Sequence, residues 1–231
     1  MTIGQKCLYV GDMTWHCLSV FYTRKNIATL LNAINNFYET NKNDMIHLSF
    51  YFSEIQGERI NIVFISEKQN SENLLERIEQ YFDQFLYERP SENLYPIPYG
   101  SVIWLPYPNN SLVWNGFCIP RFLFESEEIR NFSQATSLLI ANLYDSESSY
   151  DENTISIAGF LSVQLMKHQN STLPTIVDPE LAKTIQSYWE YKDEDLLTIW
   201  RQYANISEGS HIICFHLGLS VDALNFFTRY L

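Results

Sequence analysis

The chain has 231 residues, of which 46% are hydrophobic and 15% aromatic, and a formal net charge of −12 at pH 7. This content is enough to bury a sizeable hydrophobic core. The excess of acidic side chains would repel a phosphate backbone, so we expect no nucleic-acid partner. No apolar run approaches the ~20 residues of a membrane helix, and the amino terminus lacks a signal-peptide pattern, so we expect no membrane partner and a cytoplasmic location.

The first third of the chain predicts alternating strands and helices. Residues 15–22 (WHCLSVFY) read as a strand, and Thr23 is placed to cap a helix. Residues 45–64 contain two strand-like apolar runs joined by a polar turn, with Arg59 at the start of the second run. The first helix is indicated by apolar residues that recur at helical spacing, namely Ile27, Leu30, Leu31, Ile34 and Phe37.

A second helix is predicted to begin at Ser71 and to end before Pro90, with its apolar residues on one face. The order strand, helix, hairpin, helix indicates an α+β fold with an antiparallel sheet and a split βαβ-like N-terminal half. We expect the helices of this half to lie on one side of the sheet.

Residues 89–120 differ in composition from the rest of the chain, because they contain six of the eight prolines and a high density of aromatic residues. We expect a structured loop with short strands. Its aromatic residues, among them Tyr99, Trp104 and Trp114, are candidates for a rigid wall that binds substrate. The alternative is a satellite core packed under a long loop.

The remainder of the chain predicts a mostly helical C-terminal half. We expect one domain over residues 1–231, made of an α/β half (1–88), an aromatic and proline-rich region (89–120) and a helical half (121–231). The predicted helices cover residues 125–144, 153–167, 179–191 and 194–203, followed by two final segments that are split near Gly218.

The usual catalytic motifs for nucleotides, dinucleotides, zinc and esterase chemistry are missing from the sequence, so we expect no cofactor and no metal. The four cysteines lack metal-ligand spacing and are best explained as small buried thiols. Ser210, His211 and His216 are the candidate catalytic residues, since imidazole and hydroxyl groups can exchange protons near neutral pH. The alternative is a structural pair, an N-cap serine and a histidine at a helix end.

The order of these segments is similar to the elimination-domain family of lantibiotic dehydratases, also called thiopeptide-type bacteriocin biosynthesis domains. The resemblance covers nearly the whole chain at low identity. Its motifs are the hairpin run HLSFYFSEIQGERINIVF, then YPIPYG, FLFESEEI and SHIICFHLGLS.

The chain departs from this family where the family's chemistry is implied to lie. Two arginines of the family's second hairpin strand align with Asn61 and Val63, and a preceding histidine aligns with Arg59. In dehydratases these residues are implied to bind and expel glutamate from a glutamylated serine or threonine. A carboxylate favours a guanidinium clamp, so the pair Asn61 and Val63 argues against that reaction.

The chain therefore resembles the branch of stand-alone pyridine synthases of thiopeptide biosynthesis, of the thiocillin and micrococcin type. The implied activity is a formal [4+2] cycloaddition that joins two dehydroalanines of one peptide, with loss of water and of the leader peptide. The implied partner is a modified precursor peptide, consisting of a leader and a dehydrated, azole-containing core; a homodimer is compatible with this reading. Arg59 and Asn61 are expected to bind the leader or an amide carbonyl, unless they are ordinary strand residues.

Two other functions stay open. The first alternative is a separate glutamate-elimination subunit of a split dehydratase, which the missing arginines argue against. The second is a non-catalytic module that binds a leader peptide.

Overall fold

The computed structural model describes residues 7–92, 107–169 and 194–220. The chain divides into two compact units, Met1–Pro120 and Arg121–Leu231. The boundary falls where the helical half was predicted to begin. Each unit is described by itself below.

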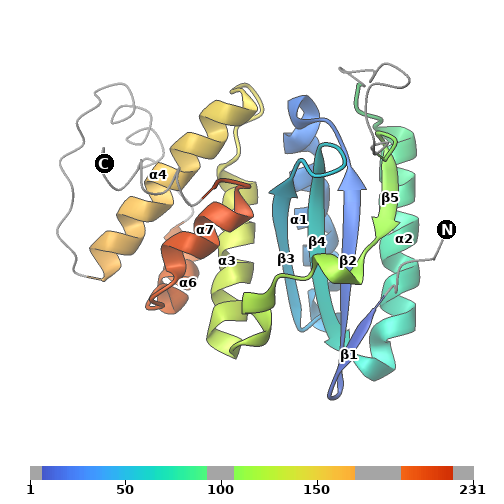
Figure 1. Cartoon of the computed structure of the whole chain (residues 1–231), viewed down its shortest axis with the longest axis horizontal. Helices are drawn as coiled ribbons and strands as arrows, with labels where there is room; N and C mark the ends of the chain where they lie inside the picture. The colour runs from blue at the N-terminus through green and yellow to red at the C-terminus, as the bar shows by residue number, and fades with distance from the viewer. Residues whose placement is uncertain (1–6, 93–106, 170–193, 221–231) are drawn as a thin grey trace. The chain divides into compact units, whose positions relative to one another are not determined.

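The first unit is built on an antiparallel sheet in which the order of strands is β1-β2-β4-β3, with β5 also paired to β2 (Figure 1). Because β4 lies between β2 and β3 and is antiparallel to both, β2 and β3 run in the same direction, as a split βαβ unit requires. This confirms the predicted fold. The strands are β1 (Leu8–Val10), β2 (Met13–Phe21), β3 (His47–Ser53), β4 (Arg59–Glu67) and β5 (Ser111–Trp114).

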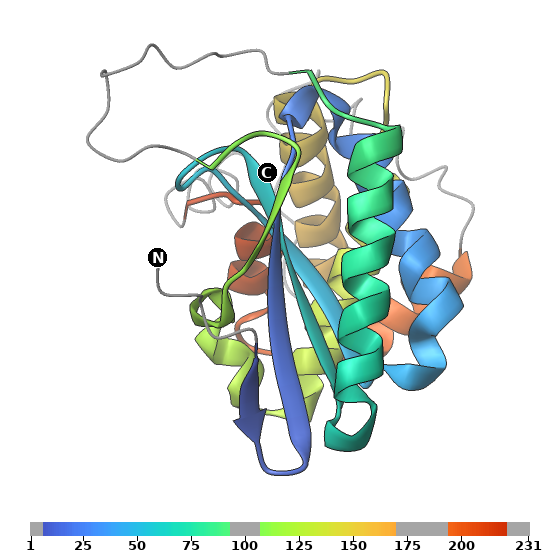
Figure 2. The same ribbon diagram turned by 90° about the vertical axis from the view of Figure 1, so that its right-hand side faces the viewer.

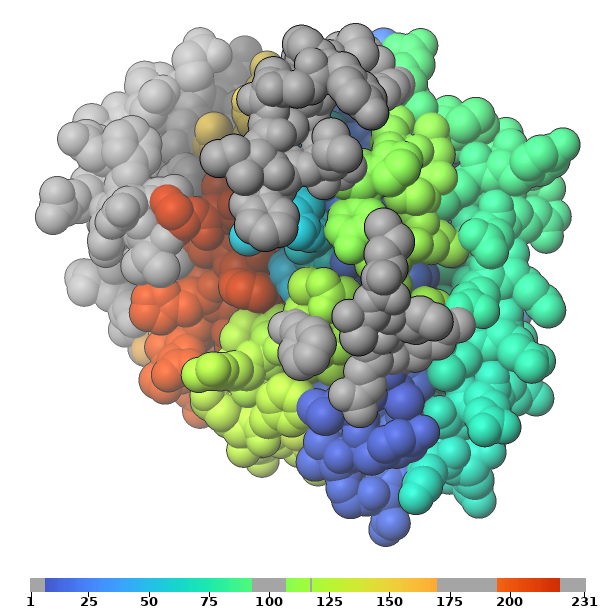
Figure 3. All heavy atoms as spheres, turned by 45° about the vertical axis from the view of Figure 1, so that its right-hand side comes forward, coloured from blue at the N-terminus to red at the C-terminus, as the bar shows by residue number. Residues whose placement is uncertain are grey.

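Two helices, α1 (Ile27–Asn41) and α2 (Ser71–Glu88), lie side by side on one face of this sheet (Figure 2). Phe37 of α1 makes ring contacts with Phe64 of β4 and with Phe82 of α2, so one aromatic side chain joins three elements. The Tyr81 hydroxyl also donates to the carbonyl of Ala33 at 2.9 Å. The space-filling view shows the side chains of α2 along one edge of the molecule and the β1–β2 hairpin at its lower end (Figure 3).

Thr23 has a different role from the predicted helix cap. A short 3-10 turn, Arg24–Asn26, separates it from α1, and its side chain makes no capping bond. Instead its backbone N–H donates to Ser91 Oγ at 3.1 Å, and its hydroxyl donates to the carbonyl of Glu92. The reason is that two polar segments meet at the end of β2 and offer this threonine longer-range partners.

The described part of the second unit contains η5 (Arg121–Phe124), α3 (Glu127–Leu143), α4 (Tyr150–His168), α6 (Glu194–Tyr203) and α7 (Gly209–His216). There, α6, α7 and η5 pack on α3, and α4 packs on α7. Phe132 of α3 lies against Trp200 of α6, with ring centroids 5.4 Å apart, and the Trp200 indole donates to Thr136 at 2.9 Å. A Cβ on Gly209 would lie 3.0 Å from Leu165 Cδ2, so the glycine allows α7 to approach α4 closely.

The mostly helical second half is thus confirmed over the described residues. The predicted helix 179–191, the segment after residue 220, and both Tyr99 and Trp104 lie outside them. Among the described helices, none is long and apolar enough to cross a membrane.

Candidate functional site

The best candidate site lies on the face of the sheet opposite α1 and α2. Side chains alternate between the two faces of a strand, so Arg59, Asn61 and Val63 of β4 share one face. The strand register places Ser19 of β2 and Tyr51 of β3 directly beside Asn61. Each of these strands therefore contributes one polar residue to a row across this face of the sheet.

Asn61 is fully buried, and its side chain is held in one orientation by Ser19. The Ser19 hydroxyl donates to Asn61 Oδ1 at 2.6 Å. The amide nitrogen Nδ2 of Asn61 has no hydrogen-bond partner among the residues that the structure describes, although it too is buried. A buried donor without a partner costs free energy, so a polar group of this kind calls for an explanation.

Arg59 lies two residues before Asn61 and is only 7% exposed. Its guanidinium carbon lies 5.4 Å from the ring centroid of Phe21, its register partner on β2, in a cation–π contact. Its Nη2 lies 3.9 Å from Cys118 Sγ, whereas its Nε has no hydrogen-bond partner in the described parts of the chain. No carboxylate of the described residues forms an ion pair with Arg59. The positive charge is thus buried without a matching negative one.

Two thiols and a phenol complete the surroundings of Arg59. The Tyr51 hydroxyl donates to the backbone carbonyl of Cys118. Burial raises the pKa of Tyr51, and the neighbouring thiols of Cys17 and Cys118 raise it further. Burial also raises the pKa of Cys17 well above its usual value, an effect that Cys118 strengthens and Arg59 opposes. At neutral pH both Tyr51 and Cys17 are therefore neutral.

The predicted binding residue Trp114 does not join this group. It pairs with Leu18 in the β2–β5 register and therefore lies on the helix-covered face, where its indole donates to Glu79 of α2 at 2.5 Å. Arg59 and Asn61 are consequently brought together, and Trp114 is separated from them by the sheet.

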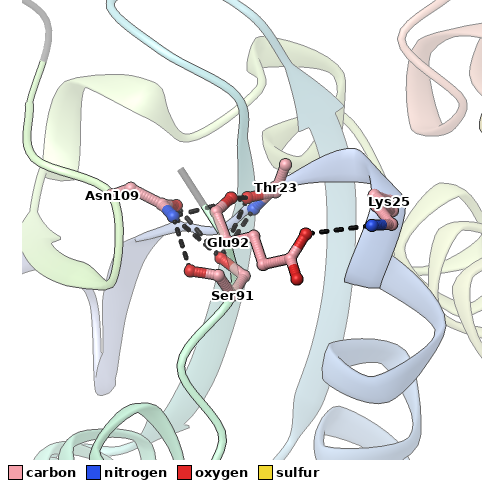
Figure 4. A network of polar contacts seen from close by, with 5 residues as sticks. All are labelled: Thr23, Lys25, Ser91, Glu92 and Asn109. Atoms are coloured by element: carbon pink, nitrogen blue, oxygen red, sulfur yellow. Dashed lines mark hydrogen bonds and ion pairs between the residues drawn. The ribbon is translucent and has the colours of Figure 1, made fainter. Parts of the chain in front are cut away.

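Hydrogen bonds join the described residues on either side of the segment that contains Tyr99 and Trp104. Asn109 Nδ2 donates to the carbonyl of Ser91 at 3.1 Å, and Lys25 forms an ion pair with Glu92 at 2.9 Å (Figure 4). Asn110 adds two bonds to the backbone of Ser91, with its Oδ1 accepting at 2.7 Å and its Nδ2 donating at 2.9 Å. These contacts hold residues 91–92 beside residues 109–110.

The predicted catalytic residues of the second unit are not brought together. Ser210 and His216 lie six residues apart on the regular helix α7, which separates them by about 9 Å along the axis and places them on different faces. Ser210 is in the first turn of that helix rather than at its N-cap, which is Glu208. His211 is exposed.

His216 has other hydroxyl partners than the one predicted. It is 1% exposed, with Ser133 Oγ 2.8 Å from Nε2 and Ser137 Oγ 3.3 Å from Nδ1, both serines being on α3. The hydroxyl and imidazole groups alternate along one chain of hydrogen bonds. A neutral imidazole donates from one nitrogen and accepts at the other, so this arrangement satisfies both ring nitrogens.

Ser19, Tyr51, Cys17 and Cys118 were missed by sequence reasoning. Part of the signal was present, because polar residues occupy every second position in the run HLSFYFS and the first two alternate positions, Arg59 and Asn61, in RINIVF. Finding the site from sequence required the pairing register, since only the register shows that Ser19, Asn61 and Tyr51 are neighbours.

Comparison with known proteins gives a likeness in fold rather than in sequence. No protein-family model matches the chain, and no curated protein matches it in sequence. Among solved structures, the chain is similar to a pyridine synthase, TbtD, from thiomuracin biosynthesis. The TM-score is 0.59 and the identity is 12%, with 94% of this chain and 95% of that chain covered. The likeness therefore concerns the whole fold, although the sequences have diverged widely.

Proposed function

We propose that this chain is a macrocyclising pyridine synthase of thiopeptide biosynthesis, of the thiocillin and micrococcin type within the elimination-domain family. Its substrate would be a precursor peptide with a leader and a dehydrated, azole-containing core. The reaction would join two dehydroalanines by a formal [4+2] cycloaddition, after which water and the leader peptide leave and a pyridine ring remains.

The observation that carries this proposal is the likeness in fold to a pyridine synthase over 94% of the chain. The sheet-face residues support it from a second direction. At the two positions where the elimination-domain resemblance expects arginines, the chain has Asn61, whose Oδ1 is engaged by Ser19, and Val63, which is buried. A carboxylate clamp of several guanidinium groups cannot form from these two residues.

Such an enzyme gains most of its rate from positioning. Bringing two distant dehydroalanines into contact is an entropic problem, and effective molarities of about 10⁵ M or more are available from orientation alone. Under this proposal Arg59 and Asn61 hold an amide carbonyl of the peptide, since both present donors that lack a partner among the described residues. The aromatic residues Tyr99, Trp104 and Trp114 remain proposed wall residues.

The proton transfers are proposed for His216, with Ser210 and His211 as the other candidates on α7. His216 is preferred because its ring nitrogens lie against Ser133 and Ser137, which gives it a path for a proton through either side.

The proposal is tested by incubating the purified protein with a precursor peptide that already contains its azoles and dehydroalanines. Mass spectrometry should detect a macrocycle and the leader released as a carboxamide. Conversion of a glutamylated serine peptide to dehydroalanine would instead identify an elimination subunit. Binding of the leader without any product would identify a non-catalytic module, and either of these results would overturn the proposal.

A further inference from the structure

The unpartnered donors on the sheet face point to a ligand of defined chemistry. Arg59 Nε and Asn61 Nδ2 are the donors concerned, and they lie two residues apart on the same face of β4. That spacing corresponds to about 7 Å between their α-carbons. One oxygen atom, or the two oxygens of a carboxylate, can accept from both side chains at this separation.

The unpartnered groups call for an acceptor. Ser19 donates to one lone pair of Asn61 Oδ1, whereas Asn61 Nδ2 has no partner among the described residues. The proton of the Tyr51 hydroxyl is engaged by the carbonyl of Cys118. The guanidinium of Arg59 has no acceptor capacity at all. A ligand that satisfies Arg59 Nε and Asn61 Nδ2 must therefore supply lone pairs.

The positive charge of Arg59 favours an anionic ligand over a neutral acceptor. A buried guanidinium without an opposite charge is costly, and proteins keep such charges where a partner completes them. Arg59 forms no ion pair with any carboxylate in the described parts of the chain, and its face is occupied by Phe21. The free edge of the guanidinium, at Nε, is the side that remains for a ligand.

We infer that Arg59 and Asn61 form a binding site for an oxygen that carries negative charge. The inference that this oxygen belongs to the substrate rests on the proposed function. In that reaction the amide that becomes the diene loses its N–H proton to a general base, such as an imidazole. The nitrogen electron pair then forms the C=N bond, and the π pair of the C=O bond moves to oxygen. A proton returns to that oxygen to give the neutral imidic acid, so the site stabilises the charge between the two proton transfers.

Small probes test the site without requiring turnover. The side-chain signals of Arg59 Nε–H and Asn61 Nδ2 are followed by NMR during titration with sodium acetate, with acetamide, and with sodium chloride at matched ionic strength. We expect acetate to shift both signals at concentrations at least tenfold lower than either of the others. Equal effects of acetamide would show that charge is irrelevant, and equal effects of chloride would show nonspecific screening; either result overturns the inference.

Three variants make the test specific. Arg59→Gln should abolish the acetate response, whereas the matched change Arg24→Gln should preserve it, since Arg24 already contacts Glu54 in an ion pair. Asn61→Asp keeps the acceptor for Ser19 and places a carboxylate beside Arg59. This variant should lose the acetate response and melt no lower than the parent protein. If it melts lower and still binds acetate, the anion site is refuted.

The same titration separates this inference from the proposed function. If acetate binds as expected but no precursor peptide is cyclised, the anion site stands and the proposed function fails. If cyclisation occurs and acetate does not bind, the proposed function stands and the anion site fails.

Discussion

The burial of His216 between two serines leads to a strong prediction for stability. Replacing His216 by alanine removes the group that Ser133 contacts at 2.8 Å and Ser137 at 3.3 Å. A buried polar group that loses its partner costs about 1–3 kcal/mol. The missing imidazole also leaves a cavity beside Phe122, whose ring centroid lies 6.4 Å from that of His216.

Together these effects predict that His216→Ala loses about 3–5 kcal/mol of unfolding free energy. Urea denaturation followed by circular dichroism measures this loss. With a slope of about 2 kcal/mol per M, the midpoint should fall by about 1.5–2.5 M. The matched control is His211→Ala on the same helix, where the side chain is exposed, and it should change stability by less than about 0.5 kcal/mol.

A double-mutant cycle with Ser133→Ala isolates the hydrogen bond itself. We expect a coupling free energy of about 1 kcal/mol or more between Ser133 and His216. Equal midpoints for His216→Ala and His211→Ala would refute the structural account of this contact. Activity is then compared under conditions where each variant is folded, so that a catalytic effect of His216 is measured apart from its effect on folding.

Three further predictions concern other parts of the chain. Asn110→Ala should lower the free energy of unfolding, measured by urea denaturation, by about 2–3 kcal/mol, because it removes two hydrogen bonds to Ser91 and places alanine at a φ of 58°. Asn110→Gly should lower it by less, because glycine tolerates that φ. Burial raises the pKa of Cys214 to about 12, so above the unfolded-state value near 8.5 only the unfolded chain releases this proton and stability falls. Between pH 7 and 9.5 the parent protein should therefore lose about 1.4 kcal/mol more than Cys214→Ala, as measured in urea under reducing conditions. The backbone N–H of Ser149 donates to the Glu152 carboxylate and lowers its pKa. The stabilisation that this carboxylate gives is present above its pKa in the unfolded chain and is lost as the pH falls through its pKa in the folded protein. Glu152→Gln should therefore lower the melting temperature at pH 7 and not at pH 3.

The sequence predicted the elements that have a strong period. Apolar residues at helical spacing located α1 and α2, and the polar turn between two apolar runs located the hairpin of β3 and β4. Strand β1 was not predicted, because its three residues are all exposed and leave no alternating pattern. Thr23 occupies the N-cap position of the short turn before α1, but its side chain does not cap that turn, because its hydrogen-bond partners lie 68 and 69 residues away.

The same distinction explains the site. Arg59 was identified as the basic residue of the hairpin, and Asn61 through the resemblance to the elimination-domain family. The burial pattern of β4 is continuous on both faces and does not reveal which partners they meet. Ser210 and His216 were paired by their proximity in sequence, and the regular turns of α7 then separated them. Ser133, which contacts His216, is 83 residues away along the chain, a contact that sequence spacing cannot supply.

The charge of one buried arginine does not by itself distinguish the proposed cyclisation from glutamate elimination. In elimination an ester oxygen of the glutamyl group becomes a carboxylate oxygen as the C–O bond breaks, so negative charge develops in that transition state, as it does on the amide oxygen in the proposed tautomerisation. Only interactions that strengthen in the transition state accelerate a reaction, and a guanidinium beside either oxygen supplies one. The two reactions differ in the released glutamate, whose carboxylates favour a clamp of several guanidinium groups. Positions 61 and 63 hold asparagine and valine, so the missing clamp, rather than the charge of Arg59, is what favours cyclisation under the proposed function.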